Sequence, residues 1–209
     1  MHPVNYTRIV SSEEELRSII GFPSELVDRK VIASIDSHCR DFISRSPFLV
    51  LSTSDASGCC DVSPRGDAPG FVQVLDDKRL IIPERPGNRR IDSMRNLLSN
   101  PRAGLIFFIP GMGETLRING RACIIRDEDL LEPMAVNGKR PLLGIAVEAE
   151  ECFLHCAKAM KRSRLWEPES WSGLLPSASK ILADHAKLPG VTAAQIEERL
   201  REGYAQRLY

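Results

Sequence analysis

The spacing of hydrophobic and polar positions changes twice along the chain. In residues 1–46 apolar side chains recur every three to four positions, which is typical of amphipathic helices. In residues 47–154 they form short runs or alternate with polar residues, which is the period of β-strands. In residues 155–209 the helical spacing returns. The sequence therefore predicts a single, mainly β domain with a core at 47–154 and helices at both ends.

The N-terminal part contains signals for short helices. Ser12 is followed three residues later by Glu15, which is the pattern of a capping box, and this helix should end near Gly21. Residues 23–30 predict a second short helix or turn, and residues 36–44 predict a third helix.

The middle of the chain predicts about seven strands with short turns between them. The expected ranges are 48–53, 59–63, 71–75, 79–82, 103–109, 115–125 and 142–148, with the last extending towards residue 154. One helix is inserted after the fourth strand. Because no strand, glycine-rich loop and helix repeat in series, the order favours a closed antiparallel barrel over a doubly wound fold.

The inserted helix has an unusual beginning. Asn88 is a helix-capping residue, Ile91, Met94 and Leu98 follow at helical spacing, and residues 99–101 stop the helix. This prediction places two basic residues in the first turn of the helix.

Those two residues are Arg89 and Arg90. The N-terminus of a helix carries partial positive charge, so arginines are unfavourable there. A bound anion would reverse the effect, because free backbone N–H groups, the helix dipole and two guanidinium groups would all favour one phosphate. The alternative is that both side chains extend into water. The local sequence leaves both interpretations open.

A second group of polar residues lies in the long strand predicted at 115–125. Arg117, Asn119 and Arg121 share one face, and apolar residues occupy the other. A solvated outer face is the common explanation for such a pattern. A binding surface is the alternative.

The composition limits the classes of function. Lys and Arg together number 28, as do Asp and Glu, so the net charge is zero and a nucleic-acid partner held by bulk electrostatics is not expected. We see neither a secretory signal nor an apolar stretch of about 20 residues that would span a membrane. We therefore expect a cytoplasmic protein without a membrane partner.

The six cysteines predict reduced thiols rather than disulfides. Cys152, His155 and Cys156 lie close together in the sequence and could supply metal ligands or a nucleophile. No fourth ligand stands at zinc-like spacing, so we predict no metal site and interpret these thiols as packed side chains.

The C-terminal part predicts three more helices. Residues 157–164 are basic, residues 177–186 form the second helix, and Thr192 caps the last one. The last helix carries an apolar stripe made of Ile196, Leu200, Tyr204 and Leu208. Such a stripe must be buried against the barrel or against a second subunit.

The order of these motifs resembles the pyridoxamine 5'-phosphate oxidase-like flavoproteins. The similarity covers about residues 47–154, and its most specific parts are Asn88-Arg89-Arg90 and Ile118-Asn119-Gly120-Arg121. An uncharacterised FMN-dependent subgroup looks similar beyond the barrel, through residues 155–166 and in the final Leu208-Tyr209. The resemblance implies a split β-barrel that binds FMN, with the flavin at a homodimer interface.

The resemblance also implies roles for individual residues. The phosphate of FMN would be held by Asn88, Arg89 and Arg90. The flavin ring and the ribityl chain would be lined by Ser63, Pro64, Arg65 and Gly66. A partner subunit would complete the pocket with Arg117 and Asn119.

The expected function is FMN-dependent oxidation or reduction of an unknown small molecule. No catalytic residue is predicted, because flavin hydride transfer does not strictly require a general base. Arg164 could contact an anionic substrate and Trp166 could stack on one, although Trp166 could equally be packed at a barrel end. The chain departs from the best-known enzymes of the family around residues 63–67, so pyridoxamine phosphate oxidation is not implied. Two alternatives stay open: a non-catalytic module that binds flavin or haem, and a reductase that uses the deazaflavin F420.

Overall fold

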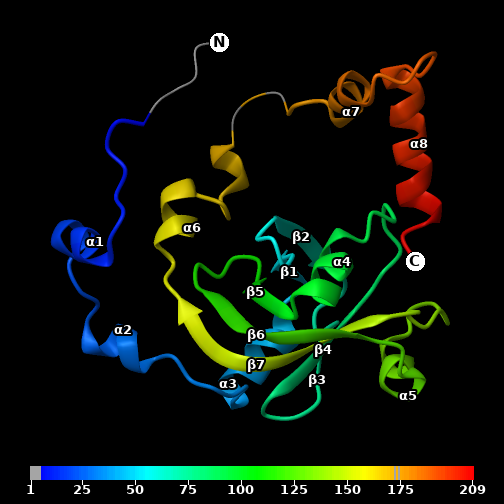
Figure 1. The fold of residues 1–209 in the computed structure, drawn as a ribbon. Helices are drawn as coiled ribbons and strands as arrows, with labels where there is room; N and C mark the ends of the chain where they lie inside the picture. The colour runs from blue at the N-terminus through cyan, green and yellow to red at the C-terminus, as the bar shows by residue number, and fades with distance from the viewer. Residues whose placement is uncertain (1–5, 172, 174) are drawn as a thin grey trace.

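The computed structural model describes residues 6–171, 173 and 175–209 and is organised around one antiparallel sheet (Figure 1). The seven strands follow the order β2-β1-β5-β6-β7-β4-β3 across the sheet. Their bounds are β1 Phe48–Ser54, β2 Cys60–Gly66, β3 Gln73–Val74, β4 Arg79–Pro83, β5 Arg102–Phe108, β6 Thr115–Ile125 and β7 Gly144–His155. The prediction of a mainly β fold with one helix after the fourth strand is confirmed.

The sheet is split rather than closed. Strands β2 and β3 stand at its two edges and do not pair with each other. The closed barrel that the number of strands suggested is therefore wrong, whereas the split barrel implied by the family resemblance is confirmed. Strand β3 spans two residues, which is too short to pair with a second neighbour along any useful length.

The helices follow the capping signals closely, with one exception described below. Their bounds are α1 Glu13–Ile20, α2 Glu25–Arg29, α3 Ser37–Arg45, α4 Asp92–Ser99, α5 Glu128–Leu131, α6 Lys158–Ser163, α7 Ala178–Ala186 and α8 Ala193–Gln206. Ser12 accepts the Glu15 amide at 3.2 Å, and Thr192 forms a complete capping box with Gln195. Short 3₁₀ turns follow at Glu132–Met134 and Pro168–Ser170.

The core lies on the inner side of the curved sheet. Alternating residues of β1, β5, β6 and β7 point inward, and α3 and α4 contribute residues such as Phe42 and Leu97 that pack against them. Fully buried side chains include Leu49 and Leu51 of β1 and Ile118 of β6. Helix α4 contacts β1, β2 and β6, so it covers one end of this inner side.

One glycine fixes how β6 pairs with β7. The register shifts by one residue between Asn119 and Gly120. A Cβ atom on Gly120 would lie 1.9 Å from the carbonyl oxygen of Glu148, so no other residue fits this position without moving the backbone. This register shift, a β-bulge, lies next to Asn119, which shares the outer face of β6 with Arg117.

The terminal helices extend away from the sheet (Figure 1). Helices α1, α2, α6 and α8 have no buried residue, and α7 packs mainly against α8. No helix in the described part of the chain is long and apolar enough to cross a membrane. The core of the protein is therefore built almost entirely from residues 35–157.

Candidate functional site

A cluster of polar side chains lies where β2 meets the start of α4. Asp61, Ser63 and Arg65 alternate along β2 and are half-buried, whereas the residues between them are exposed. They pair across the sheet with Thr53, Leu51 and Leu49, which are buried in the core. Because directly opposite residues share a face, these three side chains point to the inner side, beneath α4.

Ser93, in the first turn of α4, connects the members of this β2–α4 cluster. Its hydroxyl donates to Asp61 Oδ2 at 2.6 Å and lies 2.9 Å from the Ser63 hydroxyl. The Arg65 guanidinium donates to Ser93 at 3.3 Å and to Ser63 at 3.4 Å. Ser93 is itself buried. The helix start is thereby held against the edge strand by polar contacts.

Arg65 is the most constrained charge in the cluster. It forms an ion pair with Glu84, which follows β4, and the two side chains are 16% and 23% exposed. The Nε atom of Arg65 is buried and has no hydrogen-bond partner among the described residues. A buried N–H without an acceptor is costly, so this donor is available to a group that the chain does not supply.

The loop before α4 differs from the prediction. Helix α4 begins at Asp92 and not after Asn88, and its N-cap is Ile91, which offers no side-chain hydrogen bond. Asn88 instead accepts the Arg90 amide at 3.0 Å in a tight turn. Arg89 and Arg90 therefore precede the helix and are not in its first turn.

Backbone strain explains the displaced helix start. Arg89 has φ of 62° and Ile91 has φ of 55°, both in the left-handed region. That region is unusual for any non-glycine residue and especially for β-branched isoleucine. Such residues cannot continue a right-handed helix, which therefore starts only after the second of them. Strain of this kind persists where the surrounding structure imposes it, and it is concentrated at binding sites.

Of the three apolar residues predicted at helical spacing, Ile91 and Leu98 do not face the core. Both are more than half exposed, and α4 is buried instead through Ser93, Met94 and Leu97. This buried face places the Ser93 hydroxyl against Asp61 and Ser63 of the edge strand β2.

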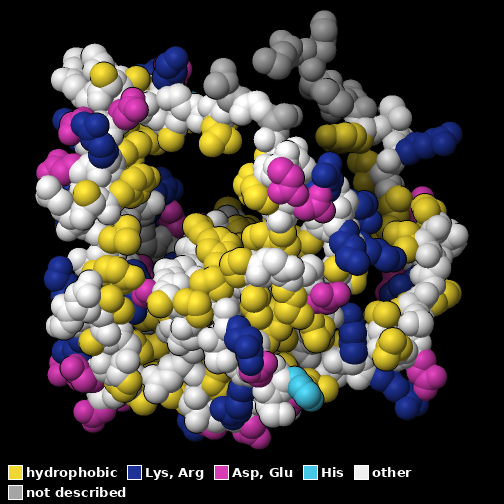
Figure 2. All heavy atoms as spheres, turned by 180° about the vertical axis from the view of Figure 1, so that it is seen from behind, with side chains coloured by type: hydrophobic (Ala, Val, Ile, Leu, Met, Phe, Trp, Pro, Cys, Tyr) yellow, Lys and Arg dark blue, Asp and Glu magenta, His cyan; other side chains and the backbone are white. Residues whose placement is uncertain are grey.

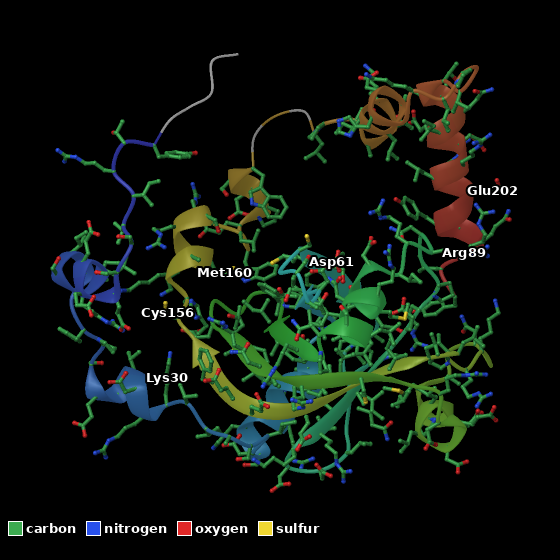
Figure 3. The ribbon with its side chains drawn as sticks, viewed as in Figure 1. Lys30, Asp61, Arg89, Cys156, Met160 and Glu202 are labelled. Atoms are coloured by element: carbon green, nitrogen blue, oxygen red, sulfur yellow. The ribbon has the colours of Figure 1, made fainter. Side chains whose placement is uncertain are left out.

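The two arginines of the loop have different surroundings. Arg90 donates to Asp92 Oδ2 at 2.7 Å, and this carboxylate raises the pKa of the guanidinium above its ordinary value. Arg89 forms no ion pair with any described residue and is exposed. In Figure 3 Arg89 lies beside the end of α8, while Asp61 lies near α4, on the edge strand β2. The loop thus presents one unpaired cation beside an uncapped helix N-terminus.

A second buried ion pair lies next to the cluster. Arg85 donates to Asp67 Oδ2 at 2.7 Å, and the Tyr209 hydroxyl donates to Asp67 Oδ1 at 2.6 Å. The Arg85 guanidinium lies 5.7 Å from the centre of the Tyr209 ring, and Lys139 donates to the Tyr209 carbonyl at 2.9 Å. These contacts fix the end of the chain beside the loop that carries Arg89.

The contacts of Asp67 shift two pKa values. Burial opposes ionisation of Asp67, but hydrogen bonds from Tyr209, the Ala68 amide and Arg85 outweigh it, so the pKa of Asp67 lies below its usual value. The pKa of Tyr209 is raised, first by its hydrogen bond to the same carboxylate. The ionised carboxylate and the neutral phenol therefore stabilise each other.

The outer side of the sheet carries the other predicted residues. Arg117 and Asn119 line an open recess of about 440 Å³, together with Val50, Ser52, Ile106 and His155. The Arg117 guanidinium lies 5.0 Å from the centre of the Phe153 ring, and Asn119 donates to Glu151 at 2.8 Å. Pro64 shares this outer side, because it pairs through Val50 and Ile106 with Arg117.

Comparison with known proteins agrees with this architecture. The sequence model for pyridoxamine 5'-phosphate oxidase matches residues 35–156, more than half of the chain. The chain belongs to the pyridoxamine 5'-phosphate oxidase family. No curated protein matches its sequence.

Solved structures that are similar to this family member have 12–19% sequence identity to it over the matched part of the chain. HupZ from Group A Streptococcus is 19% identical over 57% of this chain and 93% of its own, with a TM-score of 0.48. An FMN-binding protein from Syntrophomonas wolfei is 12% identical over 68% and 92%, with a TM-score of 0.44. An F420 reductase is 17% identical over 53% and 91%, with a TM-score of 0.39. The family assignment rests on the match of the sequence model.

The predicted substrate residues of this family member lie in another part of the fold. Trp166 is half-buried and its indole donates to the Met112 carbonyl at 2.7 Å, in the turn between β5 and β6. Arg164 is exposed and pairs with Glu167 at 2.6 Å. Both side chains thus already have partners within the protein, and neither adjoins the β2–α4 cluster.

The cysteine and histidine residues at the end of β7 and just after it do not converge. Cys152 is buried in the core, whereas His155 and Cys156 are exposed. In the described part of the chain, no three His, Cys, Asp or Glu side chains come together as metal ligands. Cys152 contacts Cys39 of α3 through its side chain, and this contact together with burial raises the pKa of Cys39.

The structure therefore divides the predicted cofactor residues of this family member into three places. Ser63 and Arg65 lie on the inner side, Asn88, Arg89 and Arg90 lie on the loop, and Pro64, Gly66, Arg117 and Asn119 lie away from the inner side. Sequence reasoning gave no role to Asp61, Glu84, Asp67, Arg85 and Ser93, and it named Tyr209 only as part of the family resemblance. Only Asp61 had a local signal, because it alternates in phase with Ser63 and Arg65.

Proposed function

We propose that the protein is an FMN-binding flavoprotein that oxidises or reduces a small molecule. The observation that carries this proposal is the beginning of α4. There an uncapped helix N-terminus, an unpaired Arg89 and two residues in the left-handed region occur within four residues. Backbone N–H groups at a helix N-terminus and a nearby guanidinium are the groups that bind phosphate.

The residues present fit FMN in kind. Arg89 and the first amides of α4 would hold the phosphate, and Arg90 would assist if it exchanged Asp92 for the phosphate. The buried Nε of Arg65 supplies a donor that lacks an acceptor in the chain. Ser63 and Ser93 offer hydroxyl groups beside it. When bound, the flavin would supply the redox chemistry, and the protein would orient it and exclude water.

We further propose that the protein acts as a homodimer with the flavin between subunits. Arg117 and Asn119 are on the opposite side of the sheet from Ser63 and Arg65, so they cannot reach the β2–α4 cluster of their own chain. They would instead complete the pocket of a partner subunit. The open recess around them is consistent with a surface that another molecule covers.

The absorption spectrum of the purified protein tests the cofactor. Bound flavin should give bands near about 370 and 450 nm. If the protein is purified without cofactor, titration with FMN should quench flavin fluorescence to a saturable end point, and a parallel titration with F420 separates the two cofactors. A Soret band, or no uptake of FMN, would overturn the proposal.

The variant Arg89→Ala with Arg90→Ala tests the phosphate site. We expect at least a hundredfold weaker FMN binding with an unchanged circular dichroism spectrum, because both side chains are exposed and their loss should not unfold the protein. The matched control is Arg121→Ala with Arg126→Ala, which removes two exposed arginines from the end of β6. Equal FMN affinity in the two double variants would show that the loop does not hold the phosphate.

Bleaching of the bound flavin separates an enzyme from a binding module. Oxidised flavin absorbs at about 450 nm. If the protein is an enzyme of this class, NADH or NADPH added without oxygen should reduce the bound flavin and lower this absorbance. Reoxidation by a candidate substrate would then identify its class. A flavin that no nicotinamide donor reduces would favour a non-catalytic module.

A further inference from the structure

The loop that presents Arg89 has few contacts that hold its middle in place. We define the Arg89 loop as residues 84–91, between β4 and α4. Among the described residues, none from Pro86 to Arg90 forms a hydrogen bond or ion pair with a residue outside the segment 86–92. The position of Arg89 therefore depends on how the two ends of the loop are fixed.

The first end of the Arg89 loop is fixed by two ion pairs. Glu84 pairs with Arg65, and Arg85 pairs with Asp67, so two successive loop residues bind alternate residues at the end of β2. The Glu84 amide also donates to the Leu143 carbonyl at 3.0 Å. This end of the loop is thus anchored where β2 ends.

The second end of the loop is the start of α4 at Asp92. Between the two ends, Arg89 and Ile91 keep φ angles of 62° and 55°. Backbone conformations of this kind persist only where the surrounding structure imposes them. Loosening the first end should therefore allow the loop to leave the conformation that presents Arg89.

Tyr209 completes the surroundings of the anchor made by Arg85 and Asp67. The side chain of Asp67 is 3% exposed, and its carboxylate accepts from the Arg85 guanidinium, the Ala68 amide and the Tyr209 hydroxyl. The Tyr209 ring lies 5.7 Å from the Arg85 guanidinium, so one tyrosine contacts both members of the ion pair. Without this side chain the carboxylate would lose a donor, and water would weaken the ion pair.

Tyr209 belongs to a segment that otherwise stands apart from the sheet. Helices α7 and α8 pack against each other, and Figure 2, which views the molecule from behind, shows an opening between them and the sheet. The apolar stripe predicted on α8 is only partly covered, since Tyr204 is 68% exposed. In the described part of the chain, the hydrogen bonds that join residues 175–209 to the rest of the protein link Tyr209 to Asp67 and to Lys139. The segment is therefore attached at Tyr209 rather than along its length.

We infer that Tyr209 is a positioning residue, which fastens the C-terminal helices to Asp67 and Arg85 and thereby holds Arg89 where it binds the phosphate of FMN. This inference rests on the proposed function, because it names a residue outside the phosphate site that keeps the phosphate-binding groups in place. Tyr209 acts through Arg85 and the loop. The position of Arg89 beside the end of α8 agrees with this role (Figure 3).

A residue that acts through the Arg89 loop should affect the phosphate of the ligand and not its ring. FMN and riboflavin share the flavin ring and the ribityl chain and differ only by the phosphate. The ratio of their dissociation constants therefore measures the contribution of the phosphate site. A general loss of structure would weaken both ligands equally and leave the ratio unchanged.

Fluorescence titration of the full chain with FMN and with riboflavin tests the inference. Tyr209→Ala should weaken FMN binding about tenfold and riboflavin binding less than about twofold, since it removes one hydrogen bond to a carboxylate and one contact with a guanidinium. Tyr209→Phe keeps the ring beside Arg85 and should weaken FMN binding only about threefold. The matched control is Tyr204→Ala, the same substitution at an exposed position of α8, which should leave both affinities unchanged.

Trypsin, which cuts after arginine, gives a second readout that needs no flavin. The rate of cutting after Arg89 or Arg90 in the folded protein can be followed by mass spectrometry. In the absence of cofactor this rate should be severalfold higher in Tyr209→Ala than in the wild type, because the loop has lost its support. Tyr204→Ala should be cut at the wild-type rate.

The outcomes separate this inference from the proposed function. A wild-type protein that binds FMN no more tightly than riboflavin would overturn the phosphate site itself, and with it the role of Tyr209. If the wild type prefers FMN, the phosphate site is supported, and an unchanged ratio of the two affinities in Tyr209→Ala would overturn the inference alone.

An unchanged rate of tryptic cutting in Tyr209→Ala would also contradict the role of Tyr209, because the loop would then be fixed without it. If circular dichroism shows that Tyr209→Ala does not fold, the titrations of Tyr209→Phe decide. In that case an FMN affinity equal to that of the wild type would overturn the inference.

Discussion

Polar side chains on the two sides of the sheet differ in how many contacts from other elements hold them. On the inner side Arg65 is held by Glu84, which follows another strand, and by Ser93 from α4. On the outer side the Arg117 guanidinium lies over the Phe153 ring and Asn119 donates to Glu151, and both partners pair with them on the neighbouring strand. The fold therefore fixes the inner polar groups by itself. It leaves the outer groups in an open recess, where a ligand or another subunit would have to complete their surroundings.

The largest expected effect comes from the residue that sets the register of the outer face. Gly120→Ala would place a Cβ atom 1.9 Å from the Glu148 carbonyl oxygen, so β6 and β7 would have to separate or slip. We expect a loss of about 3 kcal/mol or more in the free energy of unfolding, measured with urea.

Gly87→Ala is the matched control for Gly120→Ala. At Gly87 the nearest atom to the new Cβ, the Arg85 carbonyl oxygen, would be 4.0 Å away. Its effect should stay within about 0.5 kcal/mol. A small effect of Gly120→Ala would mean that this glycine does not fix the register of β6. The placement of the polar residues of β6 on the outer side would then have another cause.

A smaller effect on stability should distinguish Arg65 on the inner side from Arg117 on the outer side. Arg65→Met leaves Glu84 partly buried without its cation and removes two donors to serine hydroxyls. We expect it to cost about 2 kcal/mol, less than a fully buried pair because both side chains retain some exposure.

Arg117→Met is the comparison variant for Arg65→Met. It removes a cation that contacts one ring and faces the open recess. Its cost should be about 0.5 kcal/mol in the protein without cofactor. Equal costs in urea unfolding would show that the inner and outer polar groups are not held differently, whatever their effects on FMN binding.

The smallest effect concerns the hydrogen bond that Tyr209 donates to Asp67. Tyr209→Phe removes the hydroxyl that donates to Asp67 but keeps the ring beside Arg85. The pKa of Asp67 is lowered in the folded state, so its contribution is present above the unfolded value of about 4 and is lost as the pH falls further. The pKa of Tyr209 is raised, so its contribution is present below about pH 10 and is lost at higher pH.

The difference in stability between wild type and Tyr209→Phe should therefore be largest between about pH 4 and pH 10 and shrink on both sides. Thermal unfolding across this range measures it. A difference that is constant with pH would mean that the hydroxyl does not interact with the ionised carboxylate.

Much of the fold was predictable because its signals are local. The long strand was predicted at 115–125 and is found at Thr115–Ile125, since strict alternation is a property of neighbouring residues. Caps at Ser12 and Thr192 were also correct, because a capping side chain reaches only three residues along its own helix. The presence of a helix after the fourth strand was correct as well.

The candidate site was predicted only in part. Ser63 and Arg65 were identified from the family resemblance, and the structure places them together. Their partners Ser93 and Glu84 had no signal, because they come from elements 30 and 19 residues away. Asn88 was predicted as a cap from its residue type. The structure uses it in a turn, because the positive φ angles of Arg89 and Ile91 prevent the helix from starting there.

The sequence by itself determined the period of most elements, the helix caps at Ser12 and Thr192, and the presence of two arginines near the start of a helix. The tertiary structure decided which side of the sheet each polar residue occupies relative to the others, where α4 begins, and that Tyr209 meets Asp67 across 142 residues of chain. The physical reason is the separation along the chain between the residues that interact. Periodicity and capping act between residues a few positions apart, whereas side chains from distant elements meet only after the sheet has curved and α4 has packed against its edge.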